Sequence, residues 1–508
     1  MKKRLVGTIL TSVLVLLVGI ITLVLPVTNA KTPNPQTTEN IQKSLDKLTE
    51  KELLPLAQAG NVEAQFYLGL VYYEGKGIPH EFVKALYWFG KSAEQGNANA
   101  QCYLGAMYEN SVGVSQDYQK AVYWYQKSAE QGFANASYQL GQIYRNGEGV
   151  QKDYQKAVYW FEKWAEQGDA EAQFRLGYMY AEGQGVPQDY QKAVYWYQKS
   201  AEQGYPSAQS FLRNIYEEGK GVPKDLEKAL YWTQKLAEQG DKFSQYLLGD
   251  MYEEGKSVPQ DYQKAVYWYQ KSAEQGSANA QCLLGIMYAQ GQGVPQDYQK
   301  AVYWWQKSAE QGDVLPAIAQ RFLGIMYTKG QGVSQDYQKA VYWWQKAAEK
   351  GDAKAQCLLG MRYAEGQGVP QDYQKARYWF QKAAEKGDRT AQYNLGVTYY
   401  EAQVVPQDYQ KAVYWYQKAA EQGDALAQLN LGLMYAKGKG VPQDYQQAYV
   451  WFSLASAQGY ENSSELRDLL AKELPPEQLA EAQEWARGWN EKIQAKTTQT
   501  SEQRQKGL

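Results

Sequence analysis

Few residues in this chain of 508 have the side chains that enzymes use as nucleophiles, bases or metal ligands. There is one histidine, His80, and there are three cysteines, Cys102, Cys282 and Cys357. A single histidine excludes a zinc site built from several histidines, and it argues against Ser-His-Asp or Cys-His catalysis. Three cysteines in so long a chain do not form a disulfide framework. We therefore expect neither a metal site nor a cofactor.

Two short segments match catalytic or nucleotide-binding motifs only in part. Ser44-Leu45-Asp46-Lys47 has the S-x-x-K spacing of penicillin-binding proteins, but the companion motifs are missing. The segment from Gly249 to Ser257 ends in Gly-Lys-Ser, as a phosphate-binding loop does, but its first glycine is one residue too far away and a helix is expected before it. A pair of glycosidase carboxylates is not indicated either, because the recurring carboxylates lie 36 residues apart at expected helix ends. The sequence therefore predicts a protein that is not an enzyme.

The remaining chemistry is that of binding. The chain has 53 Lys+Arg and 55 Asp+Glu, and this near-neutral balance argues against a nucleic-acid partner, which would need a basic stripe. Aromatic residues are abundant, with 45 tyrosines and 16 tryptophans. Aromatic side chains pack in cores and anchor protein interfaces.

The tryptophans recur at a fixed interval, which identifies the elements that must position these residues. From Trp88 to Trp304 one tryptophan follows another every 36 residues; a step of 39 leads to Trp343, and steps of 36 resume up to Trp451. A period near 36 with helical composition indicates an α-solenoid. The predicted fold class is all-α: an α/α solenoid, or superhelix, of eleven helical hairpins with capping helices at both ends.

The fourth repeat, residues 169–204, shows how one unit is built. We expect its first helix over residues 170–182, ended by Gly183 in the left-handed conformation. The second helix should begin after Asp189, whose carboxylate can accept hydrogen bonds from the free N–H groups of the first turn, and it should end near residue 203. An acidic residue occupies this capping slot in all eleven repeats, with Glu81 in the first.

A glycine in the middle of the first helix needs a reason, because it costs about 1 kcal/mol relative to alanine. Gly177 is such a residue, and ten of the eleven repeats have glycine in this slot. We expect that the second helix, with its small Ala193, approaches the bare backbone closely. Arg213 replaces the glycine in the fifth repeat, where we expect a local splay. The three extra residues in the eighth repeat, around Val314-Leu315-Pro316, should bulge or lengthen the junction before helix one.

The repeat resembles the Sel-1-like repeat family in four places. These are LGxxY from Leu176 to Tyr180, the GxGVPxD loop from Gly183 to Asp189, A-x-x-W at Ala193 and Trp196, and AEQG from Ala201 to Gly204. The resemblance covers residues 61 to about 459 and a C-terminal stretch from Leu474 to Trp489. It implies a tetratricopeptide-like scaffold for protein–protein interaction, often in bacterial envelope or host-contact pathways. Some relatives are described as β-lactam hydrolases, but they have regularly spaced cysteine pairs that this chain lacks.

The ends of the chain differ from the repeats. Basic residues precede an apolar run over residues 5–25, which is typical of a signal peptide or of a membrane anchor. Cleavage after Ala30 and retention as an anchor both remain open, and both predict export to the periplasm, to the outer face of the cytoplasmic membrane or out of the cell. The predicted segments are 1–30 signal or anchor, 31–40 linker, 41–60 N-terminal capping helix, 61–459 eleven repeats, 460–494 C-terminal capping helices and 495–508 disordered tail.

One face of helix one is the most variable part of the repeat, and it is the leading candidate for binding. It lies opposite Leu176 and Tyr180, and by analogy with tetratricopeptide repeats it lines the concave surface. We expect a groove with aromatic ends and an acidic middle, suited to an extended or helical peptide or protein. Ordinary variation of a surface is the alternative. The predicted groove residues are Phe66, Leu70, Tyr73, Tyr138, Phe174, Tyr178, Glu217, Asp250, Glu253, Tyr393 and Tyr400.

A second candidate is a tyrosine slot on helix two, which holds tyrosine in ten of eleven repeats. The helical wheel places this slot away from Ala193 and Trp196, which predicts partly exposed tyrosines on the convex side. Such a ladder could stack on a cell-wall glycan such as peptidoglycan, or form a protein interface, unless each ring covers a neighbouring helix. The ladder residues are Tyr123, Tyr159, Tyr195, Tyr231 and Tyr267. The leading interpretation is an exported scaffold that binds a protein, and the alternative is a glycan-binding module.

Overall fold

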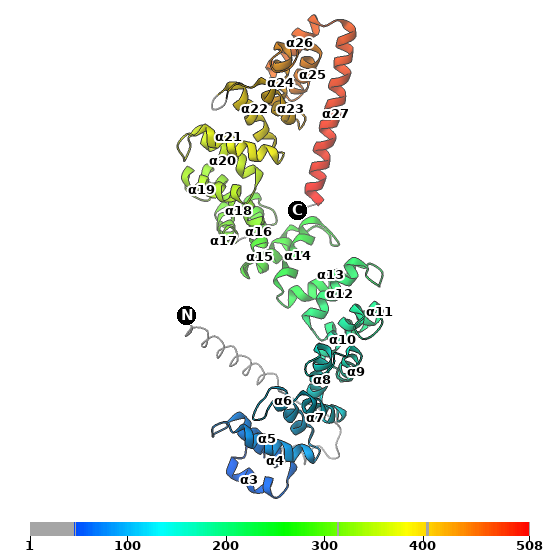
Figure 1. The fold of residues 1–508 in the computed structure, drawn as a ribbon. Coiled ribbons are helices and arrows are strands. Elements are labelled where there is room, and N and C mark those ends of the chain that lie inside the picture. Colours follow the sequence, from blue (N-terminus) through cyan, green and yellow to red (C-terminus); the bar gives the residue numbers. More distant parts are fainter. Residues whose placement is uncertain (1–44, 46, 312–313, 403–405, 507–508) are drawn as a thin grey trace. The chain divides into compact units, whose positions relative to one another are not determined.

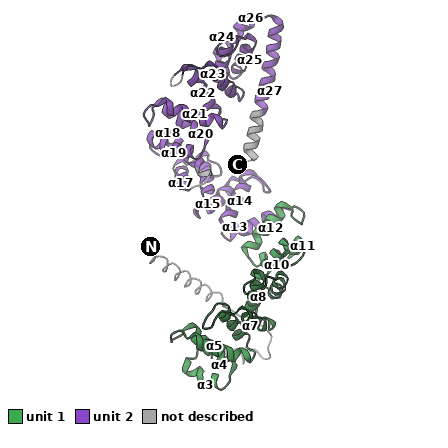
Figure 2. Cartoon of the chain, in the orientation of Figure 1, with its two compact units in different colours: residues 1–224 green, residues 225–508 purple. Residues whose placement is uncertain are grey.

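The computed structural model describes residues 45, 47–311, 314–402 and 406–506 (Figure 1). Every regular element in this part of the chain is an α-helix. Helices follow one another as hairpins joined by short loops, which is the predicted all-α solenoid arrangement of repeats. The chain divides into two compact units after Lys224 (Figure 2). Each unit is described by itself below.

The first unit holds an N-terminal helix and the first nine helices of the repeats. The N-terminal helix is α3, Glu50–Gln58, in the segment predicted as a cap. The first helices of repeats one to five are α4 Val62–Glu74, α6 Ala98–Glu109, α8 Ala134–Asn146, α10 Ala170–Glu182 and α12 Pro206–Glu218. The second helices of repeats one to four are α5 Phe82–Glu94, α7 Tyr118–Glu130, α9 Tyr154–Ala165 and α11 Tyr190–Glu202.

The second unit begins with the second helix of the fifth repeat. Its second helices are α13 Leu226–Glu238, α15 Tyr262–Glu274, α17 Tyr298–Ala309, α19 Tyr337–Glu349, α21 Tyr373–Glu385, α23 Tyr409–Ala420 and α25 Tyr445–Ser456. Its first helices are α14 Lys242–Glu254, α16 Ala278–Gln290, α18 Val314–Lys329, α20 Ala353–Glu365, α22 Arg389–Glu401 and α24 Ala425–Lys437. Helices α26, Glu461–Glu473, and α27, Pro476–Lys506, close it.

The helix ends follow the capping chemistry expected from the sequence. The Asp189 carboxylate accepts a hydrogen bond from the backbone N–H of Lys192 at 3.0 Å, and Gly183 ends α10 with φ 66°. The first repeat is an exception, because Glu81 makes no such capping bond and its carboxylate instead binds Lys84 at 2.8 Å. Glutamate is one methylene longer than aspartate, so Glu81 is a poorer cap than the sequence suggested.

The mid-helix glycine makes room for an aromatic ring. A methyl group on Gly177 would lie 2.8 Å from Cδ1 of Tyr197 and 3.2 Å from the carbonyl oxygen of Ala193. The expected close approach at Ala193 is therefore present, but the nearest group is the Tyr197 ring, which is fully buried. The equivalent rings of Phe89 and Trp305 lie over Gly69 and Gly285 in the same way.

A chain of glutamine amides joins successive repeats and was not anticipated from the sequence. Gln101 on α6 donates to the carbonyl oxygen of Ala93 at the end of α5, at 3.0 Å. Its own amide oxygen accepts a hydrogen bond of 2.7 Å from Gln131, which follows α7. The bond between two glutamines 30 residues apart recurs in six further repeats, at 2.7 to 3.0 Å. The accepting glutamines are buried, whereas the donors lie nearer the surface, so each bond satisfies a buried amide oxygen.

The insertion in the eighth repeat lengthens a helix. Helix α18 has 16 residues, whereas the other first helices have 12 or 13. The added residues form its first turn, where a proline such as Pro316 is tolerated because the first N–H groups of a helix have no intrahelical partner. The sequence interpretation placed a bulged or lengthened junction around Val314-Leu315-Pro316, but the structure includes these residues in the helix itself. Residues 312–313 lie outside the described residues. The splay predicted at Arg213 concerns a repeat that the two units share, and it stays a prediction.

The C-terminal end of the chain differs from the sequence prediction. Residues 495–506 were expected to be disordered, but α27 continues to Lys506. The segment contains neither glycine nor proline before Gly507, so no residue in it breaks a helix that has already begun. The predicted signal or anchor at residues 1–30 lies outside the described residues. Among the helices that the structure does describe, none has the length and apolar character needed to cross a membrane.

Candidate interaction surfaces

The predicted groove residues of the first repeat are packed into its core more deeply than expected. Phe66 is only 7% exposed, and its ring lies 5.9 Å from those of Phe89 and Tyr103. Tyr73 is half-buried against the same two rings, and Leu70 packs on the same cluster. The prediction that Phe66 lines an open groove is therefore wrong. Phe66 precedes Gly69 by three residues, so it shares the helix face on which the Phe89 ring lies.

In the fourth repeat the groove residues form an aromatic cluster that stays half-exposed. The Phe174 ring lies 5.7 Å from Tyr197, 5.3 Å from Tyr205 and 5.5 Å from Phe211. Tyr178 meets Phe211 edge-on at 6.1 Å. Phe211 belongs to the next repeat and was not singled out from the sequence. Tyr103 occupies the same variable slot three repeats before Phe211, so a comparison of the repeats at this slot would have found both aromatic residues.

Tyr138 of the third repeat contacts two side chains that the sequence interpretation missed. Its ring lies 4.9 Å from Trp164, which occupies a slot that holds serine or alanine in nine of the other ten repeats. The Arg175 guanidinium lies over the Tyr138 ring at 5.5 Å and is held by Glu171 at 2.5 Å. Tyr138 therefore takes part in a contact between the first helices of neighbouring repeats.

In the second unit, the predicted residues of the tenth repeat are arranged in a similar way. The Tyr393 ring lies 6.0 Å from Tyr416, and the Tyr400 ring lies 5.5 Å from Tyr409. The Lys439 ammonium lies over the Tyr400 ring at 5.5 Å. Both tyrosines are half-buried, so part of each ring remains available to a partner.

The acidic residues of the predicted groove fall in both units. Glu217 is exposed on α12 of the first unit, whereas Asp250 and Glu253 lie on α14 of the second. The Tyr269 hydroxyl lies 2.6 Å from Oδ1 of Asp250 and 2.6 Å from Oε2 of Glu253. Burial raises the pKa of the Asp250 carboxyl to about 6, although the Tyr269 hydroxyl opposes this shift. Burial raises the pKa of Glu253 as well.

The ladder tyrosines lie at the surface of helix two. The five that were predicted are 48–53% exposed. Tyr195, as an example, meets the adjacent Trp196 edge-on at 5.1 Å, and the Lys199 ammonium lies over its ring at 4.8 Å. The same tryptophan and lysine contacts recur at the other four residues. Each ring is therefore exposed, but a lysine of its own helix lies over one face.

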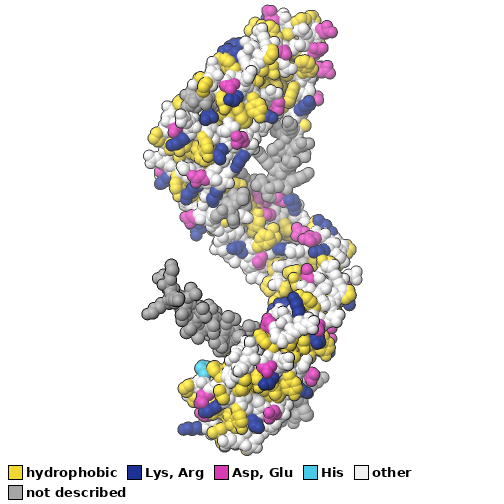
Figure 3. All heavy atoms as spheres, in the orientation of Figure 1, with side chains coloured by type: hydrophobic (Ala, Val, Ile, Leu, Met, Phe, Trp, Pro, Cys, Tyr) yellow, Lys and Arg dark blue, Asp and Glu magenta, His cyan; other side chains and the backbone are white. Residues whose placement is uncertain are grey.

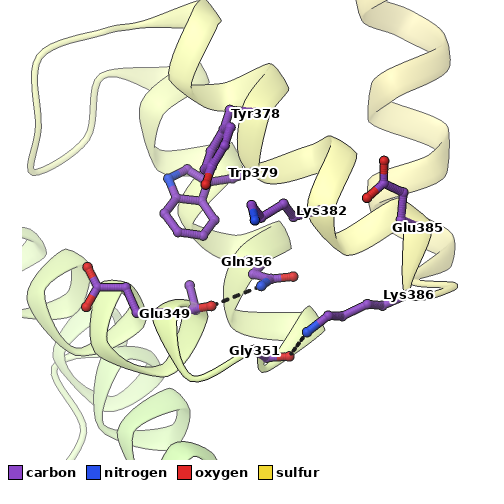
Figure 4. A pocket seen from close by; sticks show the side chains of 9 residues that line it. Glu349, Gly351, Gln356, Tyr378, Trp379, Lys382, Glu385 and Lys386 are labelled. Carbon is purple, nitrogen blue, oxygen red and sulfur yellow. Dashed lines mark hydrogen bonds between the residues drawn. The ribbon is translucent and has the colours of Figure 1, made fainter.

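One hollow of about 420 Å³ lies beside this slot in the second unit, between α19, α20 and α21 (Figure 4). Tyr378, Trp379 and Lys382 line one side of it. On the other side, Gln356 donates to the carbonyl oxygen of Ala348 at 2.9 Å, and Oε1 of Gln356 has no hydrogen-bond partner among the described residues. Lys386 stands where most repeats have the second glutamine, and it donates to the carbonyl oxygen of Gly351 at 2.7 Å instead.

Residues with metal-binding or nucleophilic side chains do not gather within the described part of the chain. No three of its His, Cys, Asp or Glu side chains are placed to hold a metal ion. The three cysteines are free thiols. Burial raises the pKa of Cys102 and Cys282 to about 12 and also raises that of Cys357, so these thiols are poor nucleophiles. Basic and acidic side chains are interspersed over the face shown in Figure 3.

Comparison with known proteins identifies the repeat. The Sel1 repeat model matches eleven consecutive segments, which cover most of the chain. The matched residues are 62–97, 98–133, 134–169, 170–205, 206–241, 242–277, 278–313, 317–352, 353–388, 390–424 and 425–460. No curated protein matches the sequence.

Two solved structures are similar in both sequence and fold. A protective antigen of uropathogenic Escherichia coli strains, which displays an SLR fold, is 39% identical with a TM-score of 0.73. The match covers 88% of this chain and 95% of the antigen. A Sel1 repeat protein from Oxalobacter formigenes is 34% identical with a TM-score of 0.51, and the match covers 65% of this chain and 93% of that one.

Proposed function

Because the chain belongs to the Sel1 repeat family, whose members generally mediate protein–protein interaction and are typically non-catalytic, we propose that it is an exported scaffold that binds a protein partner on the helix-one face. The partner would lie along the surface that carries Tyr138, Phe174 and Tyr178 in the first unit. The observation that supports this most is the contrast within each repeat. The glycine and the aromatic ring over it are present in ten of the eleven repeats and the acidic capping residue in all eleven, whereas the half-exposed residues of this face change from repeat to repeat.

The aromatic cluster supplies a suitable anchor for a partner. Phe174, Tyr178 and Phe211 are half-exposed rings held in contact with one another, so little conformational entropy is lost when a ligand packs on them. Aromatic side chains in such settings carry much of the binding energy of protein interfaces. A peptide or a helix with apolar side chains would fit this surface.

Affinity capture with paired variants tests the proposal. The groove variant combines Tyr138→Ala, Phe174→Ala and Tyr178→Ala, and we expect it to lose proteins that the unchanged chain captures from bacterial envelope fractions. The matched control combines Tyr123→Ala, Tyr159→Ala and Tyr195→Ala, which removes three tyrosines from helix two of neighbouring repeats. Because Phe174 also packs on Tyr197, circular dichroism must first show that the groove variant is folded. Equal capture by both folded variants would refute the proposal.

The second candidate function is glycan binding by the tyrosine ladder. The half-exposed rings favour it, since an exposed aromatic ring can stack on a sugar. The lysine over each ring disfavours it, because Lys199 and its equivalents already cover one face of the phenol. Co-sedimentation with insoluble peptidoglycan separates the two functions. Glycan binding predicts that the unchanged chain sediments with peptidoglycan and that the variant with Tyr123→Ala, Tyr159→Ala and Tyr195→Ala does not. The scaffold function predicts that neither protein sediments.

Export is part of the proposal and rests on the sequence of residues 1–30. Immunoblotting of cytoplasmic, periplasmic, membrane and medium fractions would test it. Sequencing of the N-terminus of the mature protein would then decide between cleavage after Ala30 and a retained anchor. Recovery of the full-length chain from the cytoplasm alone would contradict export.

A further inference from the structure

One face of α14 combines an exposed aromatic ring with two carboxylates. Phe243, Tyr246, Asp250 and Glu253 are spaced by three, four and three residues, which places them along one side of the helix. Phe243 is 55% exposed, and its ring lies 6.5 Å from that of Tyr246. We call these four residues the α14 surface. It lies wholly within the second unit.

The two carboxylates of this surface have no compensating cation. No lysine or arginine among the described residues comes within salt-bridge distance of Asp250 or Glu253, and the nearby Lys256 is paired with Glu254 at 2.5 Å. Their hydrogen-bond partners are neutral hydroxyl groups: Tyr269 can donate its single hydrogen to only one of the two carboxylates at a time, and Tyr246 donates to Asp250. Burial disfavours both charges, as the raised pKa values show. A positive charge placed here would therefore gain more electrostatic interaction energy than it would beside an exposed carboxylate.

The second repeat shows that packing needs only one of these carboxylates. Tyr125 there is the equivalent of Tyr269, and its hydroxyl binds Glu109, the equivalent of Glu253, at 2.6 Å. The position equivalent to Asp250 is Ala106. One carboxylate is thus enough to satisfy the buried phenol. In the α14 surface Asp250 also accepts a hydrogen bond from the Tyr246 hydroxyl, whereas the second repeat has Cys102 in the slot of Tyr246. The second carboxylate of the α14 surface thus adds negative charge that the buried Tyr269 phenol does not require.

We propose that the α14 surface docks a basic segment of the protein partner, with an apolar side chain against Phe243 and a lysine or arginine at Asp250 and Glu253. This rests on the proposed scaffold function and specifies the chemistry of the partner. Charge complementarity selects the cation, and the aliphatic stem of lysine or arginine can lie along the rings of Phe243 and Tyr246. Similar patterns of apolar anchors and charges set specificity in other peptide-binding grooves.

Three labelled peptides provide the test. They have twelve residues and identical leucine positions, and they differ only in carrying lysine, glutamine or glutamate at three intervening positions. Fluorescence anisotropy with the full chain should show that the lysine peptide binds at least tenfold more tightly than the glutamine peptide. The glutamate peptide should not bind. Added salt should weaken binding of the lysine peptide, because its contacts with the carboxylates are partly ionic.

Two double variants locate the binding on the molecule. Asp250→Asn with Glu253→Gln should lower the affinity for the lysine peptide at least tenfold, since both changes keep the shape of the side chain and remove its charge. The control, Glu109→Gln with Glu274→Gln, removes two negative charges elsewhere and should change the affinity less than twofold. Phe243→Ala should weaken all peptides that bind.

Several results would overturn the inference. They are equal binding of the lysine and glutamate peptides, absence of binding by all three, or equal effects of the two double variants. Binding that requires Ca²⁺ and disappears with EDTA would also overturn it, because the surface would then hold a metal ion. If the Tyr138, Phe174 and Tyr178 variant still loses partner capture while the α14 variants behave as the unchanged chain does, only this inference fails and the scaffold function stands.

Discussion

The fit between a glycine and an aromatic ring is the residue-scale contact that the repeats share most closely. Gly177 leaves no space for a side chain, because an added methyl group would lie 2.8 Å from the Tyr197 ring. Ordinary contacts between carbon atoms are 3.5 to 4.0 Å long. The repeat therefore accepts a poor helix former at this slot in exchange for close packing of its two helices.

This contact predicts opposite effects for two glycine substitutions in the first unit. Gly177→Ala should lower the free energy of unfolding by about 1–3 kcal/mol through overpacking. Gly90→Ala should leave it unchanged or raise it by up to about 1 kcal/mol, because Gly90 lies within α5 with no atom near an added methyl group. Urea unfolding followed by circular dichroism would measure both. Equal effects of the two substitutions would refute the role given to the Tyr197 ring.

The Asp250 carboxyl makes stability depend on pH in a defined direction. Its pKa is about 6 in the folded chain, above the ordinary value of 3.8. A raised pKa means that the folded state favours the protonated form, so this contribution to stability is present below about pH 4 and is lost as pH rises through 6. Tyr246, Glu253, Glu254 and Tyr269 are the titratable groups that face it.

Asp250→Asn tests this dependence, because asparagine does not titrate. The melting temperature of the variant, relative to the unchanged chain, should rise between pH 4 and pH 7. Glu274→Gln, which removes an exposed carboxylate elsewhere in the second unit, provides the comparison for a general effect of pH. A difference between Asp250→Asn and the unchanged chain that stays constant over this range would contradict the assignment.

At the scale of the helices, the sequence predicts the elements well and their faces less well. Both helices of the fourth repeat follow from Gly183, Asp189 and the apolar spacing, because these signals act locally. The burial of Phe66 does not follow, since it depends on rings contributed by another helix and by the next repeat. A helical wheel shows which residues share a side, but it does not show how deeply a neighbouring ring reaches over that side.

The hydrogen bonds between glutamine side chains show the same limit of sequence analysis. Its donors and acceptors lie 30 residues apart, and the sequence alone gives no reason to pair them. Once the structure shows that two glutamines pair, the effect of lysine in place of the donor glutamine at position 386 can be explained. Lysine has no acceptor and makes a different bond, which leaves Oε1 of Gln356 without a partner among the described residues.

Lys386→Gln should restore this bond. We expect a gain of about 0.5–1.5 kcal/mol in the free energy of unfolding, which is the usual net value of one buried hydrogen bond. The reverse change, Gln203→Lys, should cost about 1–3 kcal/mol because it removes the donor to buried Gln173. Urea unfolding would measure both. A loss of stability on Lys386→Gln would contradict the assigned role of the pair.

At the scale of the whole molecule, repetition separates packing from binding. The same glycine, ring, cap and glutamine contacts recur in most repeats of both units, so the positions that vary between repeats can be identified by comparison. The differences lie mainly on the helix-one face, where aromatic clusters, the α14 surface and exposed Glu217 follow one another along the chain. The sequence identified this face, but it could not show which of its residues remain open to a partner.

Site-specific photo-crosslinking tests the central claim most directly. Benzoyl-phenylalanine replaces Tyr178 on the helix-one face in one protein and Tyr195 on helix two of the same repeat in another, so that both probes replace a tyrosine. After irradiation of cells, the account predicts a discrete cross-linked protein from the position of Tyr178 and none from that of Tyr195. A cross-link from the position of Tyr195 alone, or from neither position, would contradict it.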